Sequence, residues 1–300
     1  MIVEKVKVKL PDFISSSLPA NIIFEIERTS NLFFGRLEEI RLRRGRKSEY
    51  VFSGKGVLGD RVVDEKEINE IFFRLCQGSV YAYEEGIRWG YIRAKGGIRI
   101  GVVGSAVLNG EKIETVHDIS SLNIRLPCPP LGGLSSLVDS VDGVRRGVLI
   151  FSPPGVGKTT FLRSIAYGLA TEKGKRVALI DTNGELSAGL DTADGRIDIL
   201  DGYPRGIGIE IAIRAMNPHF VVCDEIGNMK DAAALLGAVS CGVKILATAH
   251  GDELKGLILR PGISELYRAG AFDKFLALYR EEGRRRCLWR LFDIGETEQC

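Results

Sequence analysis

A glycine-rich segment that ends in lysine and threonine carries the clearest chemistry in this chain, SPPGVGKTT at 152–160. A nucleoside triphosphate needs backbone N–H groups turned toward its oxygens, and glycines permit that backbone shape. The lysine supplies positive charge at the β- and γ-phosphates, and the first threonine supplies a hydroxyl for Mg²⁺. The usual pattern begins with glycine; serine stands there in this chain, at a position that shapes the turn more than it touches phosphate. We predict that the segment binds ATP through Ser152, Pro153, Pro154, Gly155, Val156, Gly157, Lys158, Thr159 and Thr160.

Two carboxylates follow an apolar run at Phe220–Cys223, which is typical of a buried strand. Asp224, at the end of that strand, is predicted to hold Mg²⁺ opposite Thr159. Glu225 is predicted to act as the general base that polarises an attacking water. A strand that ends in acids is common in proteins, but it gains meaning after a phosphate-binding loop in an α/β domain.

Two other apolar runs also end in polar residues. Ile245–Ala249 delivers Thr248 and His250, which could sense the γ-phosphate or orient water; alternatively, His250 caps the next helix or satisfies backbone groups. Val177–Ile180 leads to Asp181 and, four residues later, Glu185. These acids could join the metal or water network, or Asp181 could be a simple cap.

Four arginines are candidates to complete the site. Arg205 precedes a predicted helix at Ile207–Met216, and Arg214 lies on that helix. A guanidinium that reaches the developing charge accelerates phosphoryl transfer, often from a neighbouring subunit. Arg41 and Arg43 share one face of a predicted strand at Glu39–Arg43; a solvated basic loop or a nucleic-acid patch is the alternative, although no aromatic residues interleave to stack on bases.

The elements that must position these residues alternate between strand and helix after residue 130, which predicts a parallel sheet covered on both faces. A helix is expected from Phe161, after the glycine-rich loop, and Phe275–Arg280 with Arg286–Phe292 predict a hairpin around Glu281–Gly283. The strands are predicted at Val148–Phe151, Arg176–Asp181, Phe220–Asp224 and Lys244–Ala249.

The first half has a different pattern, predicted as an α+β domain with a mixed sheet. A connection rich in proline and glycine, Leu126–Gly133, separates the halves, so we expect domains at 1–128 and 129–300. Helices are predicted at Asn21–Thr29, Glu65–Gln77 and Val80–Arg88, and strands at Glu39–Arg43, Tyr50–Phe52, Trp89–Ala94, Gly97–Val103 and Ile119–Arg125.

Composition sets further bounds. Hydrophobic residues make up 45% and charged residues 27% of the 300, and the net charge is +2, so bulk electrostatics do not call for nucleic acid or an anionic membrane. No apolar run approaches the length of a spanning helix, and the start of the chain has no signal-peptide core. The 6 cysteines form no C-x-x-C pair, which favours reduced thiols in a cytoplasmic protein.

Six segments give the chain a resemblance to a known family. In order they are EIRLRRGR (39–46), VYAYEEGIRWGYIRAKGGIRIGVVG (80–104), DISSLNIRLP (118–127), SPPGVGKTTFLRSIA (152–166), IRAMNPHFVVCDEIG (213–227) and ATAHG (247–251). Together they resemble the stage III sporulation protein AA family, ATPases of the mother-cell to forespore channel that are similar to the ATPases of type II and type IV secretion and type IV pili. The resemblance covers about Leu37 to Leu291, and its first three segments are absent from generic ATPases.

The resemblance implies a RecA-like P-loop ATPase domain joined to a smaller N-terminal α+β domain, assembled as a homohexamer with nucleotide between domains and subunits. Lys158 and Thr159 match the Walker A positions, and Asp224 and Glu225 match Walker B. His250 matches the histidine box. Arg41 and Arg43 fall where secretion ATPases place N-domain arginines near the nucleotide. The chain departs from the family after its second core strand, where Thr182-Asn183-Gly184 replaces an acidic-arginine pair.

These inferences favour a Mg²⁺-dependent ATPase motor that energises a membrane channel. Its expected partners are copies of itself and a channel protein of the sporulation stage III complex, which would hold a cytoplasmic ATPase at the membrane; nucleic acid is not expected. Two alternatives remain, a RecA-like nucleic-acid motor and a nucleotide-binding switch with slow hydrolysis, because one fold hosts many functions.

Overall fold

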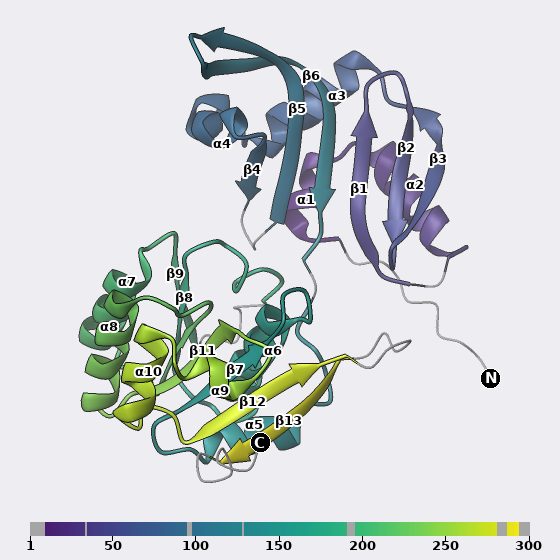
Figure 1. The fold of residues 1–300 in the computed structure, drawn as a ribbon. Helices are drawn as coiled ribbons and strands as arrows, with labels where there is room; N and C mark the ends of the chain where they lie inside the picture. The colour runs from purple at the N-terminus through teal and green to yellow at the C-terminus, as the bar shows by residue number, and fades with distance from the viewer. Residues whose placement is uncertain are drawn as a thin grey trace, which may run out of the picture. The chain divides into compact units, whose positions relative to one another are not determined.

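The computed structural model describes residues 10–33, 35–94, 98–127, 129–190, 196–280 and 287–293. The chain divides into two compact units, Met1–Cys128 and Pro129–Cys300, each with its own sheet (Figure 1). Residues 281–286 lie outside the described part, and with them the predicted turn Glu281–Gly283 and the predicted strand start at Arg286.

The first unit packs helices against a six-stranded sheet in the order β3-β2-β1-β6-β5-β4. Its elements are α1 (Asp12–Ser17), α2 (Ala20–Ser30), β1 (Leu37–Arg43), β2 (Lys47–Phe52), β3 (Lys55–Val62), α3 (Glu65–Leu75), a 3₁₀ turn (Val80–Tyr83), α4 (Glu84–Arg88), β4 (Tyr91–Ala94), β5 (Ile98–Asn109) and β6 (Lys112–Arg125). The predicted helix Val80–Arg88 is thus split into a 3₁₀ turn and a short α-helix. Helix α1 and strand β3 were not predicted.

The expectation of a mixed sheet in this unit is wrong, because every pair of named strands is antiparallel. Tight turns join β1 to β2, β2 to β3 and β5 to β6, and such short connections return the chain alongside itself. Strands β5 and β6 are also longer than predicted, and they pair out to Asn109 and Lys112.

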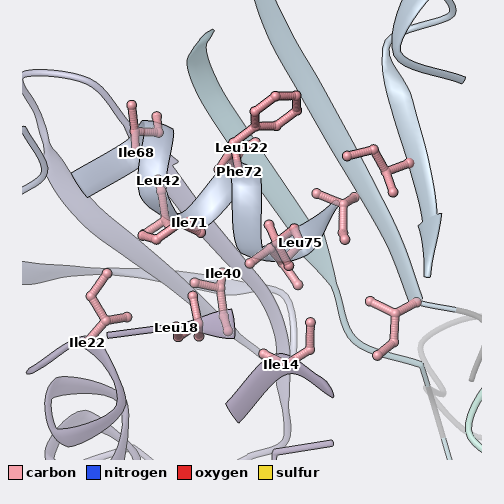
Figure 2. Packing of buried hydrophobic residues seen from close by; sticks show 14 of the residues in the cluster. Ile14, Leu18, Ile22, Ile40, Leu42, Ile68, Ile71, Phe72, Leu75 and Leu122 are labelled. Atoms are coloured by element: carbon pink, nitrogen blue, oxygen red, sulfur yellow. The ribbon is translucent and has the colours of Figure 1, made fainter. Parts of the chain in front are cut away.

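The core of the first unit forms where α3 meets the sheet. Asp64 caps α3 by accepting a hydrogen bond from the Glu67 N–H at 2.7 Å, and the helix then presents apolar residues at helical spacing. Figure 2 shows Ile68 and Ile71 of α3 lying among Ile40 and Leu42 of β1; all four are fully buried. The alternate residues of β1, Arg41 among them, are only half-buried, so helices cover one face of the sheet.

The second unit is built on a seven-stranded sheet in the order β13-β12-β7-β11-β10-β8-β9. Its elements are α5 (Ser135–Asp142), β7 (Gly147–Ser152), α6 (Lys158–Thr171), β8 (Val177–Asp181), β9 (Ile197–Asp201), α7 (Arg205–Ala215), β10 (Phe220–Cys223), α8 (Met229–Ser240), β11 (Lys244–His250), α9 (Leu254–Leu257), α10 (Pro261–Arg268), β12 (Lys274–Tyr279) and β13 (Leu288–Asp293). Helix α5 and strand β9 were not predicted.

This sheet is parallel except for β13, which pairs antiparallel to β12 as the predicted hairpin. Alternate residues of β7 enter two different cores: Val148 and Ile150 pack with α5 and α6, while Leu149 and Phe151 pack with α7, α8 and α10. A strand covered on both faces must be apolar throughout, which explains the uninterrupted run at 148–151.

Among the described residues, no helix combines the length and the apolar character that crossing a membrane would require.

Candidate nucleotide-binding site

The sheet order brings the predicted site residues to one edge. Strands β7, β11, β10 and β8 lie side by side and parallel, so their carboxyl ends meet there. The glycine-rich loop follows β7, His250 ends β11, and Asp224 follows β10. This is the edge where open α/β sheets bind ligands.

The loop between β7 and α6 has the backbone shape that its glycines allow. Gly155 and Gly157 have φ of 75° and 118°, values that residues with a side chain rarely adopt. A Cβ at either position would meet nothing within 4 Å, so backbone conformation rather than space requires glycine there. Helix α6 begins at Lys158, which places a helix N-terminus at the loop, as anion binding needs.

Lys158 is held within the loop. Its Nζ donates to the carbonyl oxygens of Ser152 at 2.9 Å and Pro153 at 3.1 Å, and lies 3.3 Å from the Ser152 Oγ. Burial lowers the pKa of Lys158, while nearby Glu225 and Asp252 oppose that effect. The serine that replaces the first glycine of the motif therefore has a contact that glycine could not make.

The same ammonium begins a chain of polar contacts, the exposed relay, formed by Lys158, His250 and Glu225. Lys158 Nζ lies 2.9 Å from His250 Nδ1, and His250 Nε2 contacts Glu225 Oε1. Because ammonium can only donate, Nδ1 accepts and Nε2–H donates to the carboxylate, which assigns the tautomer. The relay runs along the ends of the neighbouring strands β7, β11 and β10. It links the predicted phosphate-binding lysine to the predicted general base.

Glu225 is fixed in a sparsely populated backbone conformation, with φ of 52°. Its N–H donates to the Thr248 Oγ1 at 2.9 Å, and the next N–H, of Ile226, donates to the Thr248 carbonyl at 2.9 Å. Thr248 is buried and anchors the backbone beneath Glu225. Strained conformations that the surroundings enforce concentrate at functional sites.

A second set of charges, the buried triad, consists of Arg205, Asp224 and Asp231. Arg205 Nη1 donates to Asp231 Oδ2 at 2.5 Å, and Nη2 lies 3.7 Å from Asp224 Oδ1. Burial raises the pKa of Asp224 to about 6, an increase that Arg205 opposes. Sequence reasoning missed Asp231, whose only signal was an acid in the first turn of α8, three residues after the N-cap Asn228.

The residues present fit a magnesium ion. Asp224 Oδ1 is buried and makes no hydrogen bond to any described residue, with Arg205 Nη2 at 3.7 Å, and an oxygen of this kind can serve a cation or its water shell. Thr159 adds a hydroxyl in the first turn of α6. Within the described ranges no cluster of three His, Cys, Asp or Glu side chains could hold a metal by itself. Phosphate oxygens would therefore have to complete the ligand set.

The Asp181 carboxylate binds groups of the loop that follows its strand. The Asp181 carboxylate accepts from the N–H groups of Glu185 at 3.0 Å and Ser187 at 2.8 Å and from the Ser187 hydroxyl at 2.7 Å. Of the two alternatives for Asp181, the structure favours the cap. Arg163 of α6, which sequence reasoning did not single out, donates to the Ala188 carbonyl and so braces the same loop.

A cavity of about 460 Å³ adjoins the loop. Val156, Gly157 and Thr160 line it, together with Tyr279 and Trp289 of the β12–β13 hairpin. Mainly apolar walls with aromatic rings suit a flat nucleoside beside a phosphate-binding loop.

The remaining predicted arginines each pair with a glutamate of their own unit. Arg214 is 81% exposed, and its nearest carboxylate is Glu210 at 3.8 Å. In the first unit, Arg41 pairs with Glu39 at 2.7 Å and Arg43 with Glu49 at 2.8 Å, on the half-buried face of β1.

Sequence comparison places these residues within a known family. Residues 2–291 match the family described as "Sporulation stage III, protein AA". Stage III sporulation protein AA of Bacillus subtilis is 33% identical over 257 residues, which cover 82% of this chain and 84% of that protein. A longer plant relative, Protein SEEDLING PLASTID DEVELOPMENT 1 of Arabidopsis thaliana, is 29% identical over 76% of this chain, which corresponds to 32% of its own length.

Solved structures share the fold. The pilus retraction motor PilT with bound ADP superposes with a TM-score of 0.64 at 14% identity, over 95% of this chain and 83% of PilT. The Legionella pneumophila ATPase DotB gives a TM-score of 0.60 at 13% identity, over 94% of this chain and 83% of DotB. The chain therefore has the fold of the P-loop secretion ATPases, with its N-terminal domain, as predicted.

Proposed function

Because the chain belongs to the sporulation stage III protein AA family, we propose that it is an ATP-hydrolysing motor of endospore formation that energises the channel between mother cell and forespore. The observation that carries the proposal is the exposed relay, in which Lys158 of the glycine-rich loop is joined to Glu225 through His250. A phosphate-binding lysine next to an acid held by an imidazole is the equipment of phosphoryl transfer to water.

In the proposed reaction, ATP lies on the loop, with its γ-phosphate toward Lys158 and Glu225. The phosphates draw the Lys158 ammonium away from the carbonyl oxygens of Ser152 and Pro153, because charged oxygens bind it more strongly. Glu225 accepts a proton from the attacking water while the Nε2–H of His250 orients its carboxylate. Thr159 and Asp224 would hold Mg²⁺, which neutralises charge on the β- and γ-oxygens when bound.

The proposal includes assembly, because a guanidinium from another subunit could meet the transferred phosphate; among the described residues, the exposed Arg260 contacts the backbone carbonyl of His250 and not a relay side chain. Arg214, Arg41 and Arg43 are candidates to supply one, from another subunit or from the N-terminal domain. PilT and DotB are a pilus motor and an ATPase; by analogy with such ATPases, we propose a homohexamer that docks on a channel protein at the membrane. The likeness to PilT and DotB is one of fold, and the ring and its docking are part of our proposal.

The test is turnover as a function of protein concentration. Purified protein with Mg²⁺ and ATP should release phosphate, and its specific activity should rise with concentration as subunits assemble. Sedimentation with and without Mg²⁺–ATP reports the assembly independently. Full activity in a monomer would contradict the proposed ring, and no phosphate release at any concentration would contradict the proposed ATPase. A salt-dependent shift of duplex DNA would instead favour a nucleic-acid motor.

A further inference from the structure

Arg205 is a largely buried charged partner of two carboxylates at the site. Its side chain is 13% exposed and faces two acids, Asp231 at 2.5 Å and Asp224 at 3.7 Å, whose side chains are 6% and 7% exposed. The Asp231 Oδ2 also accepts from Asn228 Nδ2 at 2.9 Å, so this end of the contact is fixed by the N-cap of α8. The guanidinium is thus held at one end, and its other end points toward the metal-side aspartate.

The position of Arg205 on its helix does not by itself favour a positive charge. Arg205 is the first residue of α7, where the helix dipole disfavours positive charge. An arginine in that place has to be compensated by nearby carboxylates, and Asp224 and Asp231 supply two of them. Its burial also sets it apart from Arg214 on the same helix, which extends into solvent.

From this geometry we infer that Arg205 is a positioning residue that acts within its own subunit: it braces Asp224 against the fixed Asp231 and so shapes the Mg²⁺ site. The inference rests on the proposed function, because it assigns a supporting residue to that same site. It differs from the expectation of an arginine finger, which would have to leave its own carboxylates to reach a neighbour's nucleotide.

The contact with both aspartates depends on the two terminal nitrogens of the planar guanidinium. One terminal nitrogen engages Asp231 while the other faces Asp224, so a single rigid group spans two elements, the end of β10 and the first turn of α8. A lysine ammonium is a point charge that can approach one carboxylate closely and neutralises the pair without fixing their spacing. Arg205→Lys therefore keeps the positive charge but removes the two-nitrogen geometry.

The experiment compares the Mg²⁺ requirement of four proteins: wild type, Arg205→Gln, Arg205→Lys and Asp231→Asn. Affinity for a fluorescent ATP analogue is measured in EDTA and across a Mg²⁺ titration, and phosphate release is followed across the same titration. Arg268→Gln is the matched control, because Arg268 is an exposed arginine at the end of α10. Binding in EDTA depends on the loop and shows that each variant is folded.

We expect Arg205→Gln and Asp231→Asn to raise the half-saturating Mg²⁺ concentration by about tenfold in both measurements, the scale of one charge-assisted hydrogen bond. Arg205→Lys should give a smaller shift, and EDTA-state binding should stay within about threefold of wild type, less than the loss of one such bond. An unchanged Mg²⁺ requirement in Arg205→Gln would overturn the inference.

Mixing two inactive variants distinguishes an Arg205 that acts within its own subunit from one that acts as an arginine finger on a neighbour. At a Mg²⁺ concentration too low to support Arg205→Gln turnover, Arg205→Gln chains mixed with Lys158→Ala chains should not regain turnover, because each site lacks a residue of its own subunit. Recovered turnover in the mixture would overturn the inference, since it would show Arg205 acting on a neighbour's nucleotide. If wild type binds the analogue with Mg²⁺ but releases no phosphate, the proposed function fails while the Mg²⁺-dependent binding still tests Arg205.

Discussion

The exposed relay and the buried triad lie at neighbouring strand ends but differ in their access to water. In the relay, Lys158 is buried but the side chains of His250 and Glu225 are 40% and 52% exposed, whereas the side chains of the triad are all at most 13% exposed. Exposed side chains exchange partners readily, and buried charges keep theirs, because an unpaired buried charge is unstable. The comparison suggests that His250 and Glu225 rearrange during the reaction while the triad provides a fixed support.

Removing the first member of the relay should have the largest effect. We expect Lys158→Ala to abolish nucleotide binding, because the loop loses the charge placed at the β- and γ-phosphates. A fluorescent ATP analogue measures the affinity, and Lys255→Ala, at an exposed lysine of α9, is the control. Wild-type affinity in Lys158→Ala would remove the relay from the nucleotide site.

At the other end of the relay, Glu225→Gln should separate binding from turnover. The amide keeps the size of the side chain but cannot accept the water's proton, so turnover should fall by ~10²-fold or more while ATP stays bound. Phosphate release and analogue affinity are measured on the same preparation. Persistent turnover with weakened binding would show that the roles of Glu225 and Asp224 are exchanged.

A substitution in the triad should change the stability of the protein, and we expect it to raise the stability rather than lower it. Because burial raises the pKa of Asp224 to about 6, its ionised form is less stable in the folded protein than in the unfolded chain. We expect Asp224→Asn to raise the unfolding free energy by about 1–3 kcal/mol at pH 8, without nucleotide or Mg²⁺.

The pH dependence checks the cause of that gain. The folded-state pKa lies above the unfolded one, so wild type loses stability as the pH rises from about 4 through 6. The advantage of Asp224→Asn should therefore shrink as the pH falls toward 4 and vanish below the unfolded-state pKa of 3.8, where the carboxyl is protonated in both states. Urea unfolding at several pH values measures it, and an advantage that is constant with pH would point to packing instead of charge.

The smallest effect on the fold is expected in the N-terminal domain. Arg41 and Arg43 each pair with a partly exposed glutamate of their own sheet, so Arg41→Ala or Arg43→Ala should change the unfolding free energy by no more than about 1 kcal/mol. We expect both to weaken closure of this domain on ATP, measured by solution scattering with a nonhydrolysable analogue. Normal closure in both variants would show that Arg41 and Arg43 do not act on ATP and would leave the relay and the triad as the charges that do.

Much of the second domain could be predicted from local sequence. The strand, glycine loop and helix at 147–171 follow from an apolar run, two glycines and a helix start, all of which act over a few residues. The hairpin of β12 and β13 was predicted for the same reason. Strand β9 was missed because Ile197–Asp201 alternates with acids and resembles a surface loop until it pairs with β8.

Less of the first domain was predictable. Strand β3 contains two glycines and three charged residues, which weaken any strand pattern, and it exists because β2 offers it a hydrogen-bonding edge. The expected mixed sheet was wrong because strand direction depends on which strands become neighbours, and sequence spacing alone did not reveal that.

The sequence by itself determined the chemical inventory: a loop with a lysine that can cradle phosphate after one apolar strand, an adjacent pair of acids after a second and a histidine at the end of a third. Only the tertiary structure decided how they meet. Strand β11 comes last along the chain of the three strands involved, yet it inserts between β7 and β10 and so places His250 between Lys158 and Glu225. Parallel strands are joined by crossovers, so their neighbours are chosen by packing across the whole sheet rather than by local pattern. The same packing set Arg205 against Asp224 and Asp231, a contact among three elements that no single segment encodes.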